Sequence, residues 1–298
     1  MALKRINSIS ACKLPIGVLL IAWALPAFGD IAAAEHAYQN GDYSTAFKEF
    51  LPLAEQGSAR AQFRVAYMYD VGKGVARNSE QAVRWYRAAA ANGEAAAQYN
   101  LGLMLANGEG VAKDYDEAAK WFRSAASQGD SMAQYELGLL YFSGNGVPMN
   151  YAEWLKWLQS SARQGYLAAQ KELGFWLDFG CRMKRLPKYS IDSKNQSLTC
   201  GSSEAAKWYR LAAQQGDAGS QRELGQMCLE GRGVPQSDTE ALKWLHMAAD
   251  QGEADAQLSL ARMYKDGRGV PQDFITAVQI SGLTAGRGEG CRWRPAGD

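Results

Sequence analysis

A 15-residue segment recurs through this chain at a fixed period. It runs from Ala-Gln, or a close variant, to Gly-x-Gly-Val, and it starts at Ala61, Ala97, Ala133, Ser220 and Ala256. The starts lie 36, 36, 87 and 36 residues apart, so the long interval holds two periods and 15 extra residues. A repeat of this size predicts a stacked array in which each unit packs only against its neighbours.

Each unit is predicted to be a helical hairpin. In one unit the first helix is expected over residues 95–107, the turn at Gly108-Glu109-Gly110-Val111, and the second helix from Asp114 to the Gln128-Gly129 stop. Glycine suits the turn and the stop because it adopts positive φ without strain. The chain is therefore predicted to be all-α, a right-handed α-solenoid of about seven antiparallel helical hairpins.

Two further columns of the repeat support this fold. A capping box is expected at the start of the second helices, where two side chains each bond a free backbone N–H. The expected pairs are Asn78 with Gln81, Asp114 with Glu117, Asn150 with Glu153, Ser237 with Glu240, and Gly201 with Glu204 in the interrupted unit. A small residue stands in the middle of each first helix, at Ala66, Gly102, Gly138, Gly174, Gly225 and Ala261. Mid-helix glycine costs up to about 1 kcal/mol relative to alanine, so its recurrence predicts a close helix crossing.

The combined pattern, Ala-Gln, Leu-Gly, Met-Tyr, Gly-x-Gly-Val, Trp-Tyr, Ala-Ala and Gly, resembles the Sel-one-like repeat family, relatives of tetratricopeptide repeats. The resemblance covers residues 58–288 as six units. Residues 30–57, with a Gly41-Asp42-Tyr43 turn, look like a tetratricopeptide-type capping hairpin, and residues 289–298 form a tail. The last unit departs from the pattern, since Ile280 replaces the tryptophan.

The first 29 residues have the features of a secretory signal peptide. Lys4, Arg5 and Lys13 form a basic leader, an apolar stretch follows over residues 14–25, and Ala27-Phe28-Gly29 offers a cleavage site. That stretch is shorter than the roughly 20 residues of a membrane span. We therefore expect a periplasmic protein without stable membrane insertion. The formal net charge of +1 gives no indication of nucleic-acid binding.

The sequence gives little support for catalysis. His36 and His246 are the two histidines, and neither stands in a metal-binding motif. The Gly-x-Gly turns lack the residues of a phosphate loop, so no cofactor or metal is expected. Some cysteine-rich relatives are described as penicillin-binding, which leaves a repeat hydrolase or penicillin binder as an alternative; Ser-x-x-Lys occurs here at Ser10 to Lys13, inside the leader.

The tryptophan column repeats with the period, at Trp85, Trp121, Trp157, Trp208 and Trp244. One large aromatic per unit at one helical position is typical of a core ladder between hairpins. The alternative is a stacking platform for sugars or bases. The recurrence favours the core ladder.

The insertion, at about residues 181–200, is a candidate contact site. It is basic, with Arg182, Lys184, Arg185, Lys188 and Lys194 against Asp192. The resemblance implies a disulfide between Cys181 and Cys200, since family members carry disulfides within repeats. Such a bridge would remove about 3 kcal/mol of denatured-state entropy. The alternative is a solvated loop without a partner. Cys228 is expected to be a buried thiol, and its pairing with Cys291 stays open.

The other candidate site is the concave face, which the first helices line in tetratricopeptide-like arrays. Its candidate contact residues are Phe63, Tyr67, Tyr99, Leu103, Tyr135, Leu139, Lys171, Phe175 and Arg222. The N-terminal half is aromatic and apolar, and the C-terminal half is more polar and basic. Such a groove suits a protein segment. The alternative is that the aromatic residues only pack between hairpins.

These observations predict a non-catalytic protein-binding scaffold, adaptor or inhibitor. The resemblance implies narrower versions, because bacterial family members act as adaptors or regulators of envelope systems. Some relatives are periplasmic immunity proteins that block phospholipase effectors of type VI secretion. A structural organiser of an envelope complex is a further alternative.

Overall fold

The computed structural model describes residues 30–183 and 201–285. The predicted signal peptide, Lys184, Arg185, Lys188, Cys200 and Cys291 lie outside these residues, as do the side chains of Cys181 and Arg182. The described residues contain fourteen helices and no strand. The helices of the first half are α1 Ile31–Gln39, α2 Tyr43–Glu55, α3 Ala59–Val71, α4 Ser79–Ala91, α5 Ala95–Asn107, α6 Tyr115–Ser127 and α7 Ser131–Ser143. Those of the second half are α8 Tyr151–Arg163, α9 Leu167–Met183, α10 Ser202–Gln214, α11 Ala218–Glu230, α12 Asp238–Asp250, α13 Ala254–Asp266 and α14 Phe274–Ala285.

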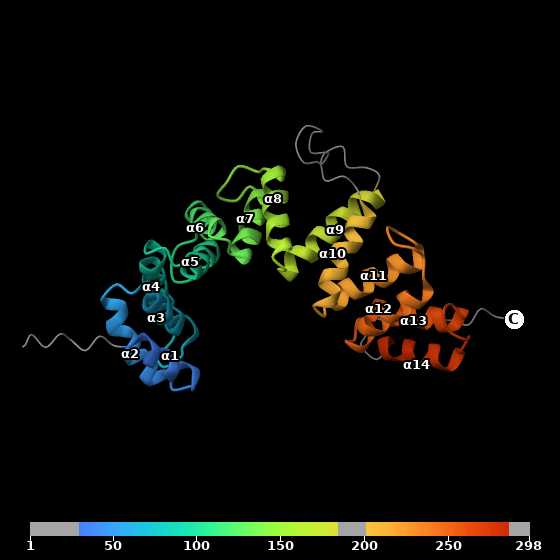
Figure 1. The fold of residues 1–298 in the computed structure, drawn as a ribbon, viewed down its shortest axis with the longest axis horizontal. Helices are drawn as coiled ribbons and strands as arrows, with labels where there is room; N and C mark the ends of the chain where they lie inside the picture. The colour runs from blue at the N-terminus through green and yellow to red at the C-terminus, as the bar shows by residue number, and fades with distance from the viewer. Residues whose placement is uncertain (1–29, 184–200, 286–298) are drawn as a thin grey trace, which may run out of the picture.

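Consecutive helices pair as antiparallel hairpins, and each hairpin packs on the next one along the chain. The units follow an arch in Figure 1, with α5 on its inner side and α6 on its outer side. This arrangement confirms the predicted all-α solenoid of seven hairpins. The insertion interrupts the array between α9 and α10, which are the two helices of one unit.

The second helices begin with half of the predicted capping box. Asp114 Oδ1 accepts a hydrogen bond from the Glu117 backbone N–H at 2.8 Å, and Asn78, Asn150 and Ser237 cap their helices in the same way. The other half of the prediction is wrong. The backbone N–H of Asp114 donates to the Leu105 carbonyl of the preceding helix at 3.0 Å. The Glu117 side chain instead accepts from the indole N–H of Trp121, at 3.1 Å.

The two glycines of each Gly-x-Gly turn have different tasks. The first, such as Gly144 with φ of 77°, ends the first helix in the left-handed conformation. The second, such as Gly146 with φ of 65°, lies against the preceding unit, where a β-carbon would overlap the Tyr115 carbonyl. This second glycine therefore sets the approach of neighbouring hairpins.

The small residues within the first helices allow the close crossing that their recurrence predicted. A β-carbon on Gly102 would lie 2.6 Å from a ring carbon of Phe122, and one on Gly225 would lie 2.7 Å from Leu245. The crossing is looser at Gly138, where the nearest atom, the Trp154 carbonyl oxygen, would be 3.5 Å away. Alanine would fit at Gly138, whereas a longer side chain would meet the backbone of α8.

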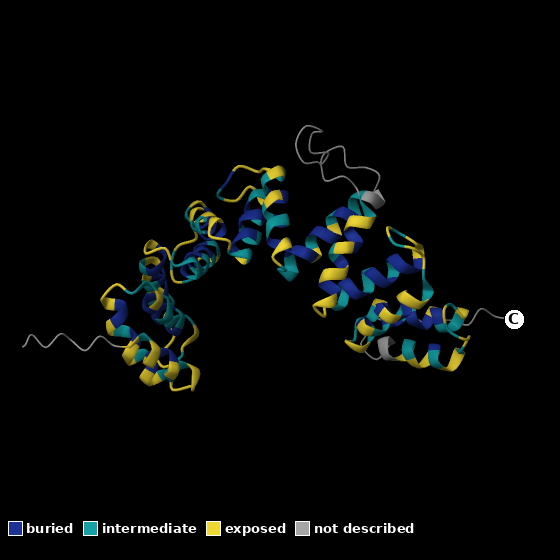
Figure 2. Ribbon diagram, in the orientation of Figure 1, coloured by how far each residue is buried: buried dark blue, intermediate teal, exposed yellow. Residues whose placement is uncertain are grey.

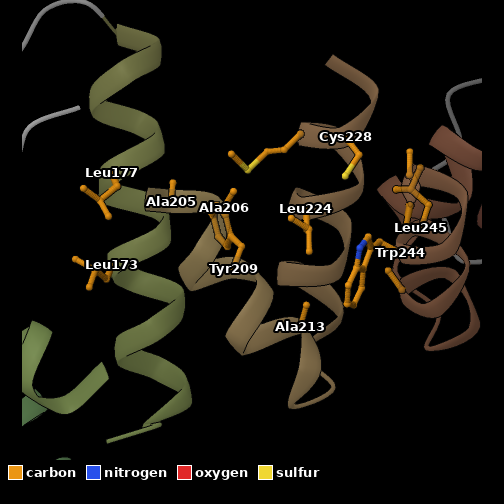
Figure 3. Close-up of a cluster of buried hydrophobic side chains, with 14 of the residues drawn as sticks. Leu173, Leu177, Ala205, Ala206, Tyr209, Ala213, Leu224, Cys228, Trp244 and Leu245 are labelled. Atoms are coloured by element: carbon orange, nitrogen blue, oxygen red, sulfur yellow. The ribbon is translucent and has the colours of Figure 1, made fainter. Parts of the chain in front are cut away.

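The repeat tryptophans were predicted to form the core, but the residue that follows each tryptophan lies at the centre of the core instead. Four of the five repeat tryptophans are half-buried and lie at the margin of the core, and Trp244 is 7% exposed. The residue after each tryptophan is the more deeply buried one, namely Tyr86, Phe122, Leu158, Tyr209 and Leu245. Figure 2 shows the buried residues along the facing sides of the helices, and Figure 3 shows Tyr209 and Leu224 inside one such cluster.

A ladder of buried glutamines links the units. In the central unit, Gln134 Nε2 donates to the Ala126 carbonyl at 3.2 Å, and its Oε1 accepts from Gln164 Nε2 at 2.8 Å. Gln62, Gln98, Gln170 and Gln221 make the equivalent two bonds. These bonds satisfy a helix-end carbonyl that the core would otherwise leave unpaired. These bonds explain why Ala-Gln recurs in the repeat.

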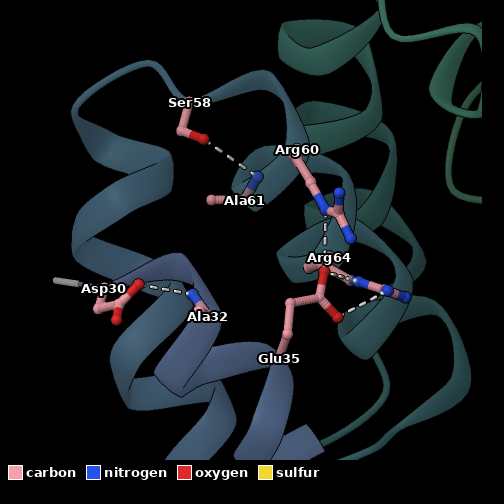
Figure 4. Close-up of polar contacts among 7 residues, drawn as sticks. All are labelled: Asp30, Ala32, Glu35, Ser58, Arg60, Ala61 and Arg64. Carbon is pink, nitrogen blue, oxygen red and sulfur yellow. Dashed lines mark hydrogen bonds and ion pairs between the residues drawn. The ribbon is translucent and has the colours of Figure 1, made fainter.

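The first hairpin is tied to the array by an ion-pair cluster on α1. Glu35 accepts from Arg60 at 3.0 Å and from Arg64 at 2.7 Å, and its side chain is 12% exposed (Figure 4). Burial acts to raise the pKa of Glu35, but the two guanidinium groups outweigh burial and lower it. The hairpin of α1 and α2 thereby covers one end of the stack.

Candidate protein-binding face

The odd-numbered helices α3 to α11 carry the predicted contact residues of the concave face, and we call their shared surface the first-helix face. Its N-terminal aromatic residues are half-buried and pack on the core. Phe63 lies 5.9 Å from Tyr86 between ring centroids, and Tyr99 lies 6.0 Å from Phe122. Tyr67, Leu103 and Leu139 are also half-buried. Packing between hairpins thus explains much of the aromatic column in this half.

A pocket opens on the first-helix face between α7, α9, α10 and α11. It has a volume of about 490 Å³ and brings together four of the predicted contact residues, Tyr135, Lys171, Phe175 and Arg222. Phe175 is 49% exposed, although it is an aromatic residue, and its ring stacks on Phe179 at 5.5 Å between centroids. Tyr209 and Ser220 also line the pocket. The pocket and the Phe175 ring beside it therefore offer apolar surface to a partner.

The cations of this pocket are neutralised by neighbouring carboxylates. Lys171 Nζ lies 2.7 Å from Asp217 Oδ1, and Arg222 lies 2.9 Å from Glu223 and 3.0 Å from Glu253. Burial acts to raise the pKa of Asp217, but Lys171 and the bonds from Ser220 outweigh burial and lower it. The polar character expected for this half is present, while the expected basic character is cancelled by pairing.

Three glutamates form a row on the same face, which we call the carboxylate row: Glu136 on α7, Glu172 on α9 and Glu223 on α11. Each occupies the same repeat position in three successive units. Burial, and then the charge of Glu172, raise the pKa of Glu136. Burial, and then the charge of Glu172, also raise the pKa of Tyr135. Sequence reasoning missed this row, although glutamate recurring at one position was a visible signal.

Replacing Glu136 with glutamine should stabilise the protein. The folded state raises the pKa of this carboxyl, so folding favours its protonated form and the group costs stability as the pH rises through its titration range. We expect Glu136→Gln to raise the melting temperature by about 2 °C at pH 7, and by less at about pH 4. Thermal melts at both pH values test this, with Glu204→Gln on α10 as an exposed control. A larger gain at the acidic pH would contradict it.

Cys228 is a buried free thiol, as predicted. It is 3% exposed and packs in the core of the C-terminal units (Figure 3). Burial, and then the charge of Glu240, raise its pKa, which makes the thiolate scarce at neutral pH. In the described part of the chain, no three or more histidine, cysteine, aspartate or glutamate side chains are grouped to hold a metal ion. None of the described helices has the length and apolar character to cross a membrane.

Comparison with known proteins places these features in a family. A Sel1 repeat model matches residues 59–94, 95–130, 131–166, 202–217, 218–253 and 254–280. The crystal structure of c5321, a protective antigen of uropathogenic Escherichia coli strains with an SLR fold, is 34% identical with a TM-score of 0.72; the match covers 82% of this chain and 49% of that one. A Sel1 repeat protein from Oxalobacter formigenes is 32% identical with a TM-score of 0.68, over 87% of this chain and 100% of that one.

A further match is to the chitin synthase regulator SKT5 of Saccharomyces cerevisiae, 41% identical over 71 residues. That stretch is 24% of this chain and 9% of the yeast protein, and the chain spans about half the length of the Escherichia coli antigen. The repeat model matches six segments that together make up more than half of the sequence. With its repeated hairpins, glycine turns and glutamine ladder, the chain belongs to the Sel1 repeat family.

Proposed function

We propose that this protein is a non-catalytic scaffold that binds another protein on its first-helix face. The observation that carries the proposal is the half-exposed Phe175 beside a pocket of about 490 Å³. An exposed aromatic ring with a concave neighbour is the arrangement in which a few residues supply most of the affinity of an interface. The Sel1 repeats supply the extended surface on which such a partner would lie.

A matched pair of substitutions tests this proposal. Phe175→Asp places a charge beside the pocket, and Ile275→Asp places one on α14, where Ile275 is 74% exposed. Phe175→Asp should capture less cross-linked partner than the wild-type protein, by about tenfold or more. Ile275→Asp should capture as much as the wild-type protein. Equal capture by the two variants, or no protein retained above a bead control, would contradict binding at this face.

We also propose that the protein works in the periplasm. The support is the leader of residues 1–29, with its basic residues, apolar stretch and small residues before the cleavage site. N-terminal sequencing of the protein from a periplasmic fraction should begin at Asp30. Recovery from the cytoplasm with an intact leader would contradict export.

A narrower version of the proposal names the partner as a phospholipase effector of type VI secretion, with this protein as its immunity protein. Its support is the resemblance of the repeat pattern. In that version the first-helix face would cover the effector's active-site entrance. The purified protein should then inhibit the lipase activity of an effector encoded beside it, and Phe175→Asp should abolish the inhibition. Full activity of that lipase in the presence of excess protein would contradict this version.

A further inference from the structure

The two glutamates at the N-terminal end of the carboxylate row have no cationic partner among the described residues. Glu223 pairs with Arg222, and Asp217 pairs with Lys171. Glu136 and Glu172 make no ion pair within residues 30–183 and 201–285, although they lie close enough for the charge of Glu172 to affect Glu136. The protein therefore keeps two half-buried carboxylates in successive units without a cation, although the Tyr135 hydroxyl is hydrogen-bonded to Glu172.

Aromatic and polar groups surround these two carboxylates. Tyr135 and Tyr166 lie 5.3 Å apart between ring centroids, in an edge arrangement. Burial, and then the charge of Glu136, raise the pKa values of Tyr99 and Tyr166, so the charge of this carboxylate reaches both rings. Aromatic faces beside carboxylates favour a cation, because the ring quadrupole and the negative charge attract it together.

The pocket next to the carboxylates offers apolar surface beside a negative charge. Glu172 lines it together with Tyr135 and Phe175, and the Phe175 side chain is 49% exposed. A basic side chain has an aliphatic stem and a cationic end, so it can use both parts of this lining.

We propose that the first-helix face binds an extended protein segment that inserts an arginine or lysine side chain between Glu136 and Glu172. The aliphatic stem or an adjacent apolar residue of that segment packs on Phe175. Charge complementarity selects this occupant, because Lys171 and Arg222 of the pocket already have anionic partners, whereas Glu136 and Glu172 have no cationic partner among the described residues. This inference rests on the proposed protein-binding function and specifies the chemistry that the face recognises.

A phage library of random dodecapeptides, panned on the purified full-length protein, tests the inference. Enriched peptides should carry arginine or lysine next to an aliphatic or aromatic residue. A representative synthetic peptide should bind the Glu136→Gln/Glu172→Gln double variant about tenfold more weakly or worse, while the Glu204→Gln control binds it unchanged. A thermal melt of the double variant checks that it is folded. We expect it to be, because Glu136→Gln should stabilise the protein.

Three outcomes would overturn the inference. The first is that the enriched peptides are acidic or show no preference for basic residues. The second is that basic peptides bind the double variant with unchanged affinity. The third is that no peptide is enriched. These outcomes are distinguishable from failure of the proposed function. If Phe175→Asp still abolishes capture of a protein partner, the face binds protein and only the basic-side-chain inference fails.

Discussion

An Arg232→Ala variant should lose about 2–3 kcal/mol of its free energy of unfolding. Arg232 lies in the turn between α11 and α12, and its guanidinium pairs with Asp178 on α9. The side chain of Asp178 is 5% exposed and that of Arg232 is 17% exposed. Removing the guanidinium takes away a charge-assisted bond to a buried carboxylate, which is more costly than the loss of an exposed pair.

The equivalent residue one period later provides the control. Arg268 also pairs with an aspartate, Asp238, at 2.6 Å, but these side chains are 41% and 32% exposed. Arg268→Ala should therefore cost less than about 1 kcal/mol. Urea unfolding of the two variants beside the parent measures the difference. Equal losses would show that burial of the Asp178 pair contributes no special stability.

The Asp178 pair also shows where sequence reasoning stopped. The period revealed the hairpins, the glycine turns and the first half of each cap, because those features depend on local geometry and repeat in every unit. Asp178 and Arg232 are 54 residues apart, and the insertion lies between them. Arg268, one period after Arg232, pairs with Asp238 on a different helix of the array, so the repeat does not predict the partner of this arginine, and the contact becomes visible only in three dimensions.

The burial pattern was predictable only in part. Successive helix residues are rotated by about 100°, so the tryptophan column and the residue after it both remain near the core side. Sequence alone could not decide that Phe122 would lie at the centre and Trp121 at its margin. The second half of the capping box failed for a related reason. The Leu105 carbonyl of the preceding helix lies within reach of the Asp114 N–H, and that is a tertiary contact.

Sequence reasoning predicted the positions of the candidate contact residues but not the net charge of the site they form. The repeat placed Tyr135, Lys171, Phe175 and Arg222 on one face, and the structure brings these four to one pocket. Counting charges along the helices suggested a basic surface. Pairing across units reverses that impression, because Lys171 is neutralised by Asp217, which comes from the loop before α11. Among the described residues, Glu136 and Glu172 are the glutamates of the carboxylate row that have no cationic partner.

A Gly146→Ala variant should lose about 3 kcal/mol of its free energy of unfolding, for two reasons that add. Gly146 has φ of 65°, where any residue with a β-carbon is strained. The new β-carbon would also overlap the carbonyl of Tyr115 at the start of α6, so the turn after α7 must move away from the preceding unit. Backbone cannot rotate aside as a side chain can, and the cost of this overlap therefore falls on the contact between hairpins.

Gly144→Ala separates the two causes. Gly144 has a similar φ of 77°, but a β-carbon there would meet Met149 Cβ at 3.5 Å, an ordinary contact. Its loss should be limited to the backbone strain of about 1–2 kcal/mol. Because Gly146 acts between units, its substitution should also broaden the urea transition, since a solenoid loses cooperativity when one nearest-neighbour interface weakens. Equal losses and equally sharp transitions for the two variants would mean that the second glycine of the turn is needed only for its φ angle.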